Sequence, residues 1–436
     1  MTKHIITFIG ACFLGLLSFA QENVYPAPAY KGLLFLKNAT VHVGNGQVLE
    51  NTTIQINNGK IEKIGQNLPI PMDDVKVFDV SGKHVYPGLI LSNSQLGLVE
   101  VNSVRATIDH TEIGDINPSI RSIVAYNTDS KVINTLKTNG ILMANIVPNG
   151  GLISGSSSVV QLDAWNWEDA AVKMENGIHL RLPSLLNRPN PFAAFSGSAS
   201  TADPVKRGLE RIEEIKAFFR EAQAYANEPK HSSTNLKYEA VKGLFNKSQK
   251  LFVHCDIVKE MLIAVDFAKE FGMDVVIMGG SESWQMADLL KANNVAVVLS
   301  QMHSLPTMTD DDVDQPYKTA VALQKAGVLY AINDEDGQTR GRNLAFNAGT
   351  SVAYGLTKEQ ALQAITLNAA KILGIDKQVG SIEVGKDASL VVSEGDILDM
   401  RTSIILHAFI QGRKVDLTDK HKQLDERYRK KYGLTK

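Results

Sequence analysis

Residues 87–98 read PGLILSNSQLGL, and the interpretation of the whole chain starts from this stretch. The Pro-Gly pair predicts a turn, and the apolar run Leu89 to Leu91 after it predicts a short buried strand. Side chains alternate between the two faces of a strand, so Asn93 and Gln95 lie on one face. The stretch therefore predicts an apolar strand that ends in two amide side chains pointing the same way.

Seven further apolar runs follow and alternate with helical patterns, which is typical of parallel β-α units. They lie at residues 140–147, 159–162, 178–182, 251–254, 275–278, 295–299 and 328–332. Together with the first strand they predict a closed (β/α)8 barrel of the TIM type, with its working face at the carboxyl ends of the strands. An open doubly wound sheet is the alternative, but no glycine fingerprint opens its first helix.

Short alternating strands flank this central α/β region on both sides. One group lies within residues 30–83, and the other lies within residues 377–417. Neither group has enough strands to bury an apolar face alone, so we expect one small composite β-sandwich domain made from both ends of the chain. The barrel then occupies residues 84–376, and residues 418–436 form a charged tail that we expect to be a solvated helix.

Several motifs resemble the amidohydrolase superfamily, in particular its imidazolonepropionase-like and exported branch. Besides PGLI they are GGLISG at 150–155, LAFNAGTSVAYG at 344–355, ALQAITLNAAKIL at 361–373 and GSIEVGKDA at 380–388. The resemblance implies the same barrel with a small β domain, and an enzyme that hydrolyses amide or cyclic amide C–N bonds with one or two bound metals. In that family the first strand reads PGLID-x-H-x-H.

The metal ligands that the resemblance implies are only partly retained. Asn93 and Gln95 stand where the first strand would carry two histidines, and Gly279 or Gly280 stands where the sixth strand would carry a third. His254 matches the histidine of the fifth strand, and Asp334 matches the catalytic aspartate after the eighth. His179 falls near the place of the bridging Lys or Glu of the fourth strand. A site of His179, His254 and Asp334 could hold one zinc ion, because three protein ligands plus water is a catalytic zinc geometry.

Other polar residues at strand ends are candidates for substrate binding, each weighed against a structural role. Asn93 and Gln95 are joined by Arg181, which shares a face with His179, by His303 after the seventh strand and by Glu282 after the sixth. A solvated loop is the plainer interpretation of Glu282, and a hydrogen-bonded histidine is the plainer interpretation of His303. Cys255 is expected to be a small buried apolar residue.

These residues leave three functional hypotheses open. The first is an exported hydrolase of small amides, cyclic amides or dipeptide-like compounds, with an altered or single-metal site. The second is a pseudoenzyme without metal, which binds a small molecule or acts as the partner subunit of an active homologue, because amides replace imidazoles poorly toward zinc. The third is a metal-independent enzyme with Asp334 as general acid and base. Each hypothesis also allows the chain to assemble as a homo-oligomer.

The N-terminal residues predict export. Lys3 precedes an apolar run from Ile5 to Phe19, and Ser18 to Ala20 supplies small residues before a cleavage point, as in a secretory signal peptide of residues 1–20. A membrane anchor and a lipoprotein signal ending at Cys12 are the alternatives. The run is shorter than the roughly 20 residues of a spanning helix and continues past Cys12. We therefore expect a periplasmic or secreted protein without a membrane span after processing.

Composition excludes some classes of partner and of stabilisation. The chain has 436 residues, a net charge of −2 and no basic cluster in its body, so a nucleic acid is an unsuitable partner. Removal of the signal peptide leaves Cys255 as the single cysteine, so no internal disulfide can form. The 44% hydrophobic content can supply a large core instead.

Overall fold

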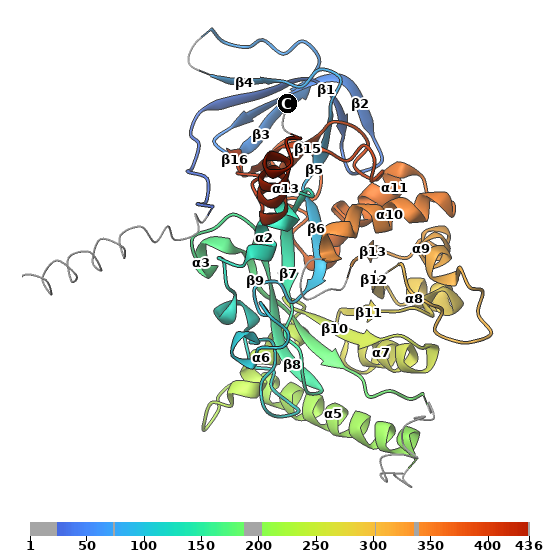
Figure 1. The fold of residues 1–436 in the computed structure, drawn as a ribbon. Coiled ribbons are helices and arrows are strands. Elements are labelled where there is room, and N and C mark those ends of the chain that lie inside the picture. The colour runs from blue at the N-terminus through green and yellow to red at the C-terminus, as the bar shows by residue number, and fades with distance from the viewer. Residues whose placement is uncertain (1–23, 73–74, 187–202, 301, 335–339, 435–436) are drawn as a thin grey trace, which may run out of the picture.

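The computed structural model describes residues 24–72, 75–186, 203–300, 302–334 and 340–434, and the predicted signal peptide lies outside them. Two eight-stranded sheets organise these residues (Figure 1). One forms the β-rich domain, and the other forms a nearly closed barrel with helices around it. The predicted fold class, a (β/α)8 barrel with a small β domain, is confirmed. No helix in the described ranges has the length and the apolar content needed to span a membrane.

The β-rich domain is one continuous sheet built from both ends of the chain. Its strand order is β16-β15-β14-β5-β1-β2-β3, with β4 paired to β1 as well. The strands are β1 (Leu33–His42), β2 (Val48–Asn57), β3 (Lys60–Gly65), β4 (Lys76–Asp79), β5 (His84–Pro87), β14 (Leu390–Ser393), β15 (Ile405–Ile410) and β16 (Arg413–Lys414). Because β14 lies between β5 and β15, the N-terminal strands depend on the C-terminal ones to complete the sheet. Alternating buried residues such as Leu34, Leu36, Ile54 and Ile56 form its core.

The barrel sheet runs in the order β13-β12-β11-β10-β9-β8-β7-β6. Its strands are β6 (Leu89–Ser94), β7 (Ile141–Ile146), β8 (Ile153–Gln161), β9 (Ala171–Arg181), β10 (Lys250–Cys255), β11 (Val275–Gly279), β12 (Ala296–Leu299) and β13 (Tyr330–Ile332). They are buried almost throughout, as expected for strands that are covered on both faces. The strands β9 to β13 pair in parallel, so their carboxyl ends meet at one edge.

The prediction that all barrel strands are parallel is wrong for one strand, β8. β8 pairs antiparallel with both β7 and β9. Gly150 and Gly151, both with positive φ, turn the chain directly from β7 into β8, and only the short helix α3 (Trp167–Ala170) separates β8 from β9. A parallel pair needs a crossover of a dozen or more residues, and these connections are too short to supply one.

Helices cover the outside of the barrel and fill the connections between its strands (Figure 1). Gly272 and Gly327 end α7 and α9 in the left-handed conformation, and Thr357 begins α11 with a capping box. The helices are α2 (Lys131–Lys137), α5 (Pro204–Asn227), α6 (Leu236–Phe245), α7 (Val258–Phe271), α8 (Ala287–Ala292), α9 (Gln315–Ala326), α10 (Leu344–Ala353), α11 (Lys358–Ala364), α12 (Leu367–Leu373) and α13 (Lys420–Lys431).

A buried aspartate joins the two domains. The carboxylate of Asp163, which follows β8, accepts hydrogen bonds from Lys137 Nζ at 2.9 Å and from the backbone N–H of Ala27 at 2.8 Å. Arg413 of β16 donates to the same carboxylate at 3.4 Å and to the carbonyl oxygen of Ala27 at 2.9 Å. The β-rich domain, the N-terminal arm and the barrel are therefore fixed to one another at this point.

Candidate functional site

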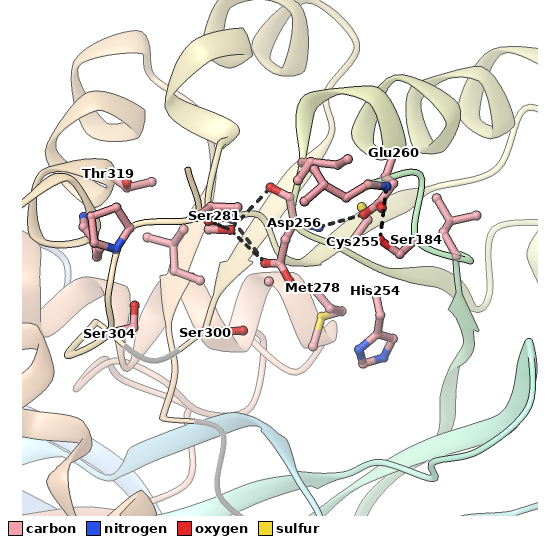
Figure 2. Close-up of a pocket in the computed structure, with 18 of the residues that line it drawn as sticks. Ser184, His254, Cys255, Asp256, Glu260, Met278, Ser281, Ser300, Ser304 and Thr319 are labelled. Atoms are coloured by element: carbon pink, nitrogen blue, oxygen red, sulfur yellow. Dashed lines mark hydrogen bonds between the residues drawn. The ribbon is translucent and has the colours of Figure 1, made fainter. Parts of the chain in front are cut away.

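A cavity of about 790 Å³ opens at the carboxyl ends of β9, β10, β11 and β12 (Figure 2). This is the edge at which barrel enzymes carry their active sites. Its ionisable residues include Arg181, His254 and Asp256, and its walls also carry hydroxyl and apolar side chains. Ser184, Ser281, Ser300 and Ser304 contribute hydroxyls, while Leu182, Ile257, Met278 and Leu299 contribute apolar surface.

Two imidazoles form a direct pair beside this cavity, and of the two only His254 lines it. His179 lies inside β9 and is fully buried, and His254 lies on the neighbouring strand β10. His179 Nδ1 is 2.8 Å from His254 Nε2, and the His179 ring stacks on Phe252 at 4.8 Å. Arg181 Nη1 lies 3.3 Å from His254 Nδ1. The sequence placed these three residues at one site, and the structure brings them into contact.

The arginine fixes the direction of the hydrogen bonds in this group. A guanidinium only donates, so His254 Nδ1 accepts and the proton of that ring is on Nε2. His254 Nε2–H then donates to His179 Nδ1, which leaves the proton of His179 on Nε2. That buried nitrogen has no hydrogen-bond partner among the described residues. We refer to the series Arg181, His254 and His179 as the donor relay.

Burial keeps both imidazoles neutral. Desolvation lowers the pKa of His179 well below its ordinary value, and the nearby charge of Arg181 lowers it further. The pKa of His254 is lowered well below its ordinary value by the same two causes and also by His179. A second positive charge at this place would therefore be opposed by both the surroundings and the guanidinium.

The residues at this site do not fit a divalent metal. Two imidazole nitrogens bound to one zinc stand roughly 3.3 Å apart, because each lies about 2.0–2.1 Å from the ion at a tetrahedral angle. His179 and His254 approach to 2.8 Å and bond each other instead. In the donor relay the remaining nitrogen, His179 Nε2, is protonated and has no lone pair for a metal. Within the described ranges, no three His, Cys, Asp or Glu side chains are grouped to hold an ion.

Asp334, the predicted catalytic aspartate, follows β13 and is buried, with 3% of its surface exposed. It is not among the residues that line the cavity, and it does not form a three-ligand cluster with the two histidines in the described part of the chain. Of the predicted zinc ligands, His179 and His254 are in contact with each other, and Asp334 does not join them in one cluster among the described residues.

At Gly279, where the resemblance predicts a histidine, the space beside the backbone is occupied by a carboxylate that follows the neighbouring strand β10. Gly279 has φ of +106°, and a Cβ atom there would lie 2.6 Å from Asp256 Oδ1. The Asp256 side chain thus lies across the end of β11, and its Oδ1 accepts from Ser281 Oγ at 3.1 Å (Figure 2). Thr307 Oγ1 donates to Ser281 Oγ at 2.8 Å. The glycine makes room for an aspartate, which the sequence analysis did not single out.

Four predicted substrate-binding residues have other surroundings in the structure. Glu282 is buried, and its carboxylate accepts from the backbone N–H of Val258 at 2.8 Å, so the interpretation as a solvated loop residue is wrong. This bond satisfies a free N–H in the first turn of α7. His303 Nε2 lies 2.7 Å from Thr350 Oγ1 and its ring contacts Tyr317. Among the described residues, the side chains that line the cavity do not include Asn93, Gln95, Glu282 or His303.

Asn333 is a second residue that the sequence analysis missed. Its Oδ1 accepts from the backbone N–H groups of Ser92 and Asn93 at 2.9 and 3.1 Å, and its Nδ2 donates to the carbonyl oxygen of Asn93 at 3.0 Å. It thereby links the end of β13 to β6, which are not neighbours in the sheet. Its position directly after the last strand was the available signal.

The fold is a barrel of the TIM type with a cavity at the carboxyl ends of its strands. A model of the amidohydrolase family matches residues 249–418. The structure of an amidohydrolase from Thermotoga maritima MSB8 superimposes with a TM-score of 0.71 at 26% identity, covering 88% of this chain and 99% of that one. The chain belongs to the amidohydrolase superfamily.

Other relatives are more distant or shorter in their match. Amidohydrolase tasK of Hapsidospora irregularis is 21% identical over 386 residues, which is 79% of this chain and 38% of that protein. An imidazolonepropionase of Picrophilus torridus is 27% identical over 176 residues, covering 38% of this chain and 42% of that protein. The chain therefore spans about two fifths of the length of these relatives. A prolidase complexed with N-methylphosphonate-L-proline shares the fold, with a TM-score of 0.54 at 16% identity.

Proposed function

We propose that this protein binds a small molecule at the mouth of its barrel without the catalytic metal of its family. The observation that carries the proposal is the 2.8 Å contact between His179 Nδ1 and His254 Nε2, with Arg181 Nη1 on the far side. This donor relay uses the nitrogens that would otherwise bind an ion. A cavity of about 790 Å³ with few charged and many apolar or hydroxyl side chains is the setting expected for a small ligand.

Elemental analysis after dialysis against a weak chelator tests the proposal. We expect clearly less than one divalent ion per chain. A stoichiometric zinc that survives dialysis, and that disappears in His254→Ala but not in the exposed control His421→Ala, would overturn it. A further variant restores histidines at both Asn93 and Gln95. Metal gained only in that variant would show that the loss of metal binding lies in the first strand.

The second candidate function is the hydrolysis of C–N bonds in small amides, cyclic amides or dipeptide-like compounds. It is supported by family membership and by the retention of His179, His254 and Asp334 at the barrel mouth. One zinc on these three residues would supply a polarised water for attack on the amide carbon, but the donor relay would first have to open. The same elemental analysis separates the two candidates, because this one requires a retained ion.

We further propose that the protein is exported to the periplasm or the medium and that it acts as a homo-oligomer or beside a homologous amidohydrolase subunit. The motive for export is the predicted signal peptide of residues 1–20. The intact mass of protein from its native host should correspond to a chain beginning near Gln21, and a mass that includes the first 20 residues would refute export. Light scattering of the same sample should show more than one chain, and a monomer would refute the pairing.

A further inference from the structure

Helix α13 (dark red in Figure 1) is fixed to the protein at its first turn and is exposed beyond it. Asp419 precedes the helix and is buried, and its carboxylate accepts from Thr138 Oγ1 at 2.8 Å and from the backbone N–H of Lys422 at 2.8 Å. None of the residues of α13 is buried, and Leu424 alone is partly covered. The sides of this helix are therefore open to a partner.

Positive charge is concentrated on one side of α13. Residues 420–434 contain six Lys or Arg and two acidic residues, a net charge of +4, whereas the whole chain has a net charge of −2. Because an α-helix turns by about 100° per residue, one side carries basic residues alone, and the two acidic residues lie on the opposite side among the other basic ones. The basic side consists of Lys420, Arg427, Lys430 and Lys431, and the mixed side consists of Lys422, Asp425, Glu426 and Arg429.

The two sides also differ in their ion pairs. On the mixed side, Arg429 Nε lies 2.7 Å from Asp425 Oδ2. Within the described ranges, no carboxylate pairs with the four residues of the basic side. Their charge is therefore not compensated by the protein itself.

Two exposed tyrosines lie beside the basic side. Tyr428 and Tyr432 are 50% and 64% exposed, and their rings stack with the centroids 6.5 Å apart. Lys431 Nζ lies 5.8 and 5.1 Å from the two ring centroids, and Leu434 follows with 65% of its surface exposed. Tyrosine has an apolar ring and a polar hydroxyl, and it is enriched where a membrane meets water. A basic face next to exposed aromatic side chains is typical of helices that lie on a membrane surface.

We propose that α13 binds the surface of an anionic membrane, with its basic side on the lipid phosphates and its two tyrosines at the level of the headgroups. An anionic leaflet attracts basic residues that come within a Debye length of it. Nucleic acids attract the same charges, and the choice of lipid rests on the proposed export, which places the chain beside a membrane. The proposal describes attachment to a surface, and it is independent of the barrel cavity and its metal content.

Sedimentation with lipid vesicles at low and at high salt tests the inference. The probes are vesicles of equal parts phosphatidylglycerol and phosphatidylcholine, and vesicles of phosphatidylcholine alone. We expect binding to the anionic vesicles that weakens as the salt concentration rises. The vesicles of phosphatidylcholine alone measure any contribution from the apolar residues 5–19 in a chain that still carries them.

Two double variants with the same change of net charge separate the basic side from the helix as a whole. Lys430→Gln with Lys431→Gln should weaken binding to the anionic vesicles about 30-fold. Lys422→Gln with Arg429→Gln, on the mixed side, should weaken it by less than about threefold. Glutamine has a helix propensity close to that of lysine and arginine, and circular dichroism with thermal melting shows that each variant is folded.

A third double variant tests the tyrosines. Tyr428→Ser with Tyr432→Ser should weaken binding at high salt as well, where the charges are screened. Equal losses in the two charge variants, or equal binding to both kinds of vesicle, would overturn the inference. A DNA oligonucleotide that binds as tightly as the anionic vesicles, and equally in the tyrosine variant, would also overturn it, because α13 would then be a general site for polyanions. Export is measured separately by the intact mass, so a chain that keeps its first 20 residues and still shows the expected differences between variants would refute export alone.

Discussion

A single glycine illustrates how one residue changes the chemistry of this barrel. Gly279 ends β11 at the position where the family resemblance placed a histidine, and Asp256 Oδ1 occupies the space that its side chain would need. The carbonyl oxygen of Cys255 is also close, at 3.0 Å from the position that a Cβ atom would take on this backbone. The absence of a side chain at Gly279 therefore leaves the space in which the Asp256 carboxylate lies.

Replacing Gly279 by alanine should therefore cost more stability than the same change at a glycine with similar backbone and open surroundings. Gly46 has φ of +100° and no atom within 4 Å of its Cβ position, so it reports the backbone strain alone. We expect about 1 kcal/mol for Gly46→Ala and about 1 kcal/mol more for Gly279→Ala, because Asp256 must move. Urea unfolding of both variants gives the comparison, and equal costs would contradict the close contact with Asp256.

At the scale of elements, the barrel is closed by a side chain where the strand pairing stops. The sheet runs from β13 to β6 without a ladder between these two strands. Asn333 provides three hydrogen bonds across the gap, and the carbonyl oxygen of Ile365 accepts from the N–H of Ile90 at 3.0 Å. The first strand is therefore held in place by a residue 240 positions further along the chain.

Asn333→Ala should destabilise the protein by about 2–4 kcal/mol, because the buried N–H groups of Ser92 and Asn93 lose their acceptor. Asn368→Ala is the matched control, since its Nδ2 donates a single bond to the carbonyl oxygen of Tyr330 at 3.0 Å. We expect a smaller cost there, of about 1 kcal/mol. Chemical unfolding measures both, and hydrogen exchange should be faster at residues 92 and 93 in the first variant only. Unchanged exchange there would show that Asn333 does not close the barrel.

At the scale of the whole molecule, buried and partly buried histidines link stability to pH. Burial lowers the pKa of His179 and His254 in the barrel, of His84 and His407 in the β-rich domain, and of His110 near the barrel mouth. All five are therefore neutral in the folded chain at pH values where an unfolded histidine is protonated. Both domains contribute, so the effect is a property of the entire fold.

Stability should fall as the pH is lowered below about 6.5, the ordinary pKa of histidine. Below that pH these histidines are protonated in the unfolded chain but remain neutral in the folded chain. Each such histidine therefore lowers the free energy of unfolding by up to about 1.4 kcal/mol per pH unit. Between pH 7.5 and 6.5 the loss should be small. Urea midpoints at pH 7.5, 6.5, 6.0 and 5.5 provide the measurement. A constant midpoint over this range would mean that the histidines titrate in the folded state as they do in the unfolded chain.

The sequence by itself determined the architecture and part of the site. Apolar runs at regular intervals predicted the barrel strands, and the two groups of short strands predicted the β-rich domain. Both predictions were possible because the alternation and the burial of a strand follow from the order of apolar and polar residues within a short segment. The family resemblance pointed to His179, His254 and Asp334 and predicted that Asn93, Gln95 and Gly279 stand in the places of imidazoles. These features depend on residue type and spacing, which the sequence states directly.

The tertiary structure alone decided how these residues act. His179 and His254 are 75 positions apart, and only their contact with each other and with Arg181 shows the direction of the hydrogen bonds that join them. The antiparallel course of β8, the carboxylate of Asp256 above Gly279 and the closure by Asn333 also arise from contacts between distant segments. Hydrogen-bond direction and charge separation depend on such contacts, and no local pattern in the chain encodes them.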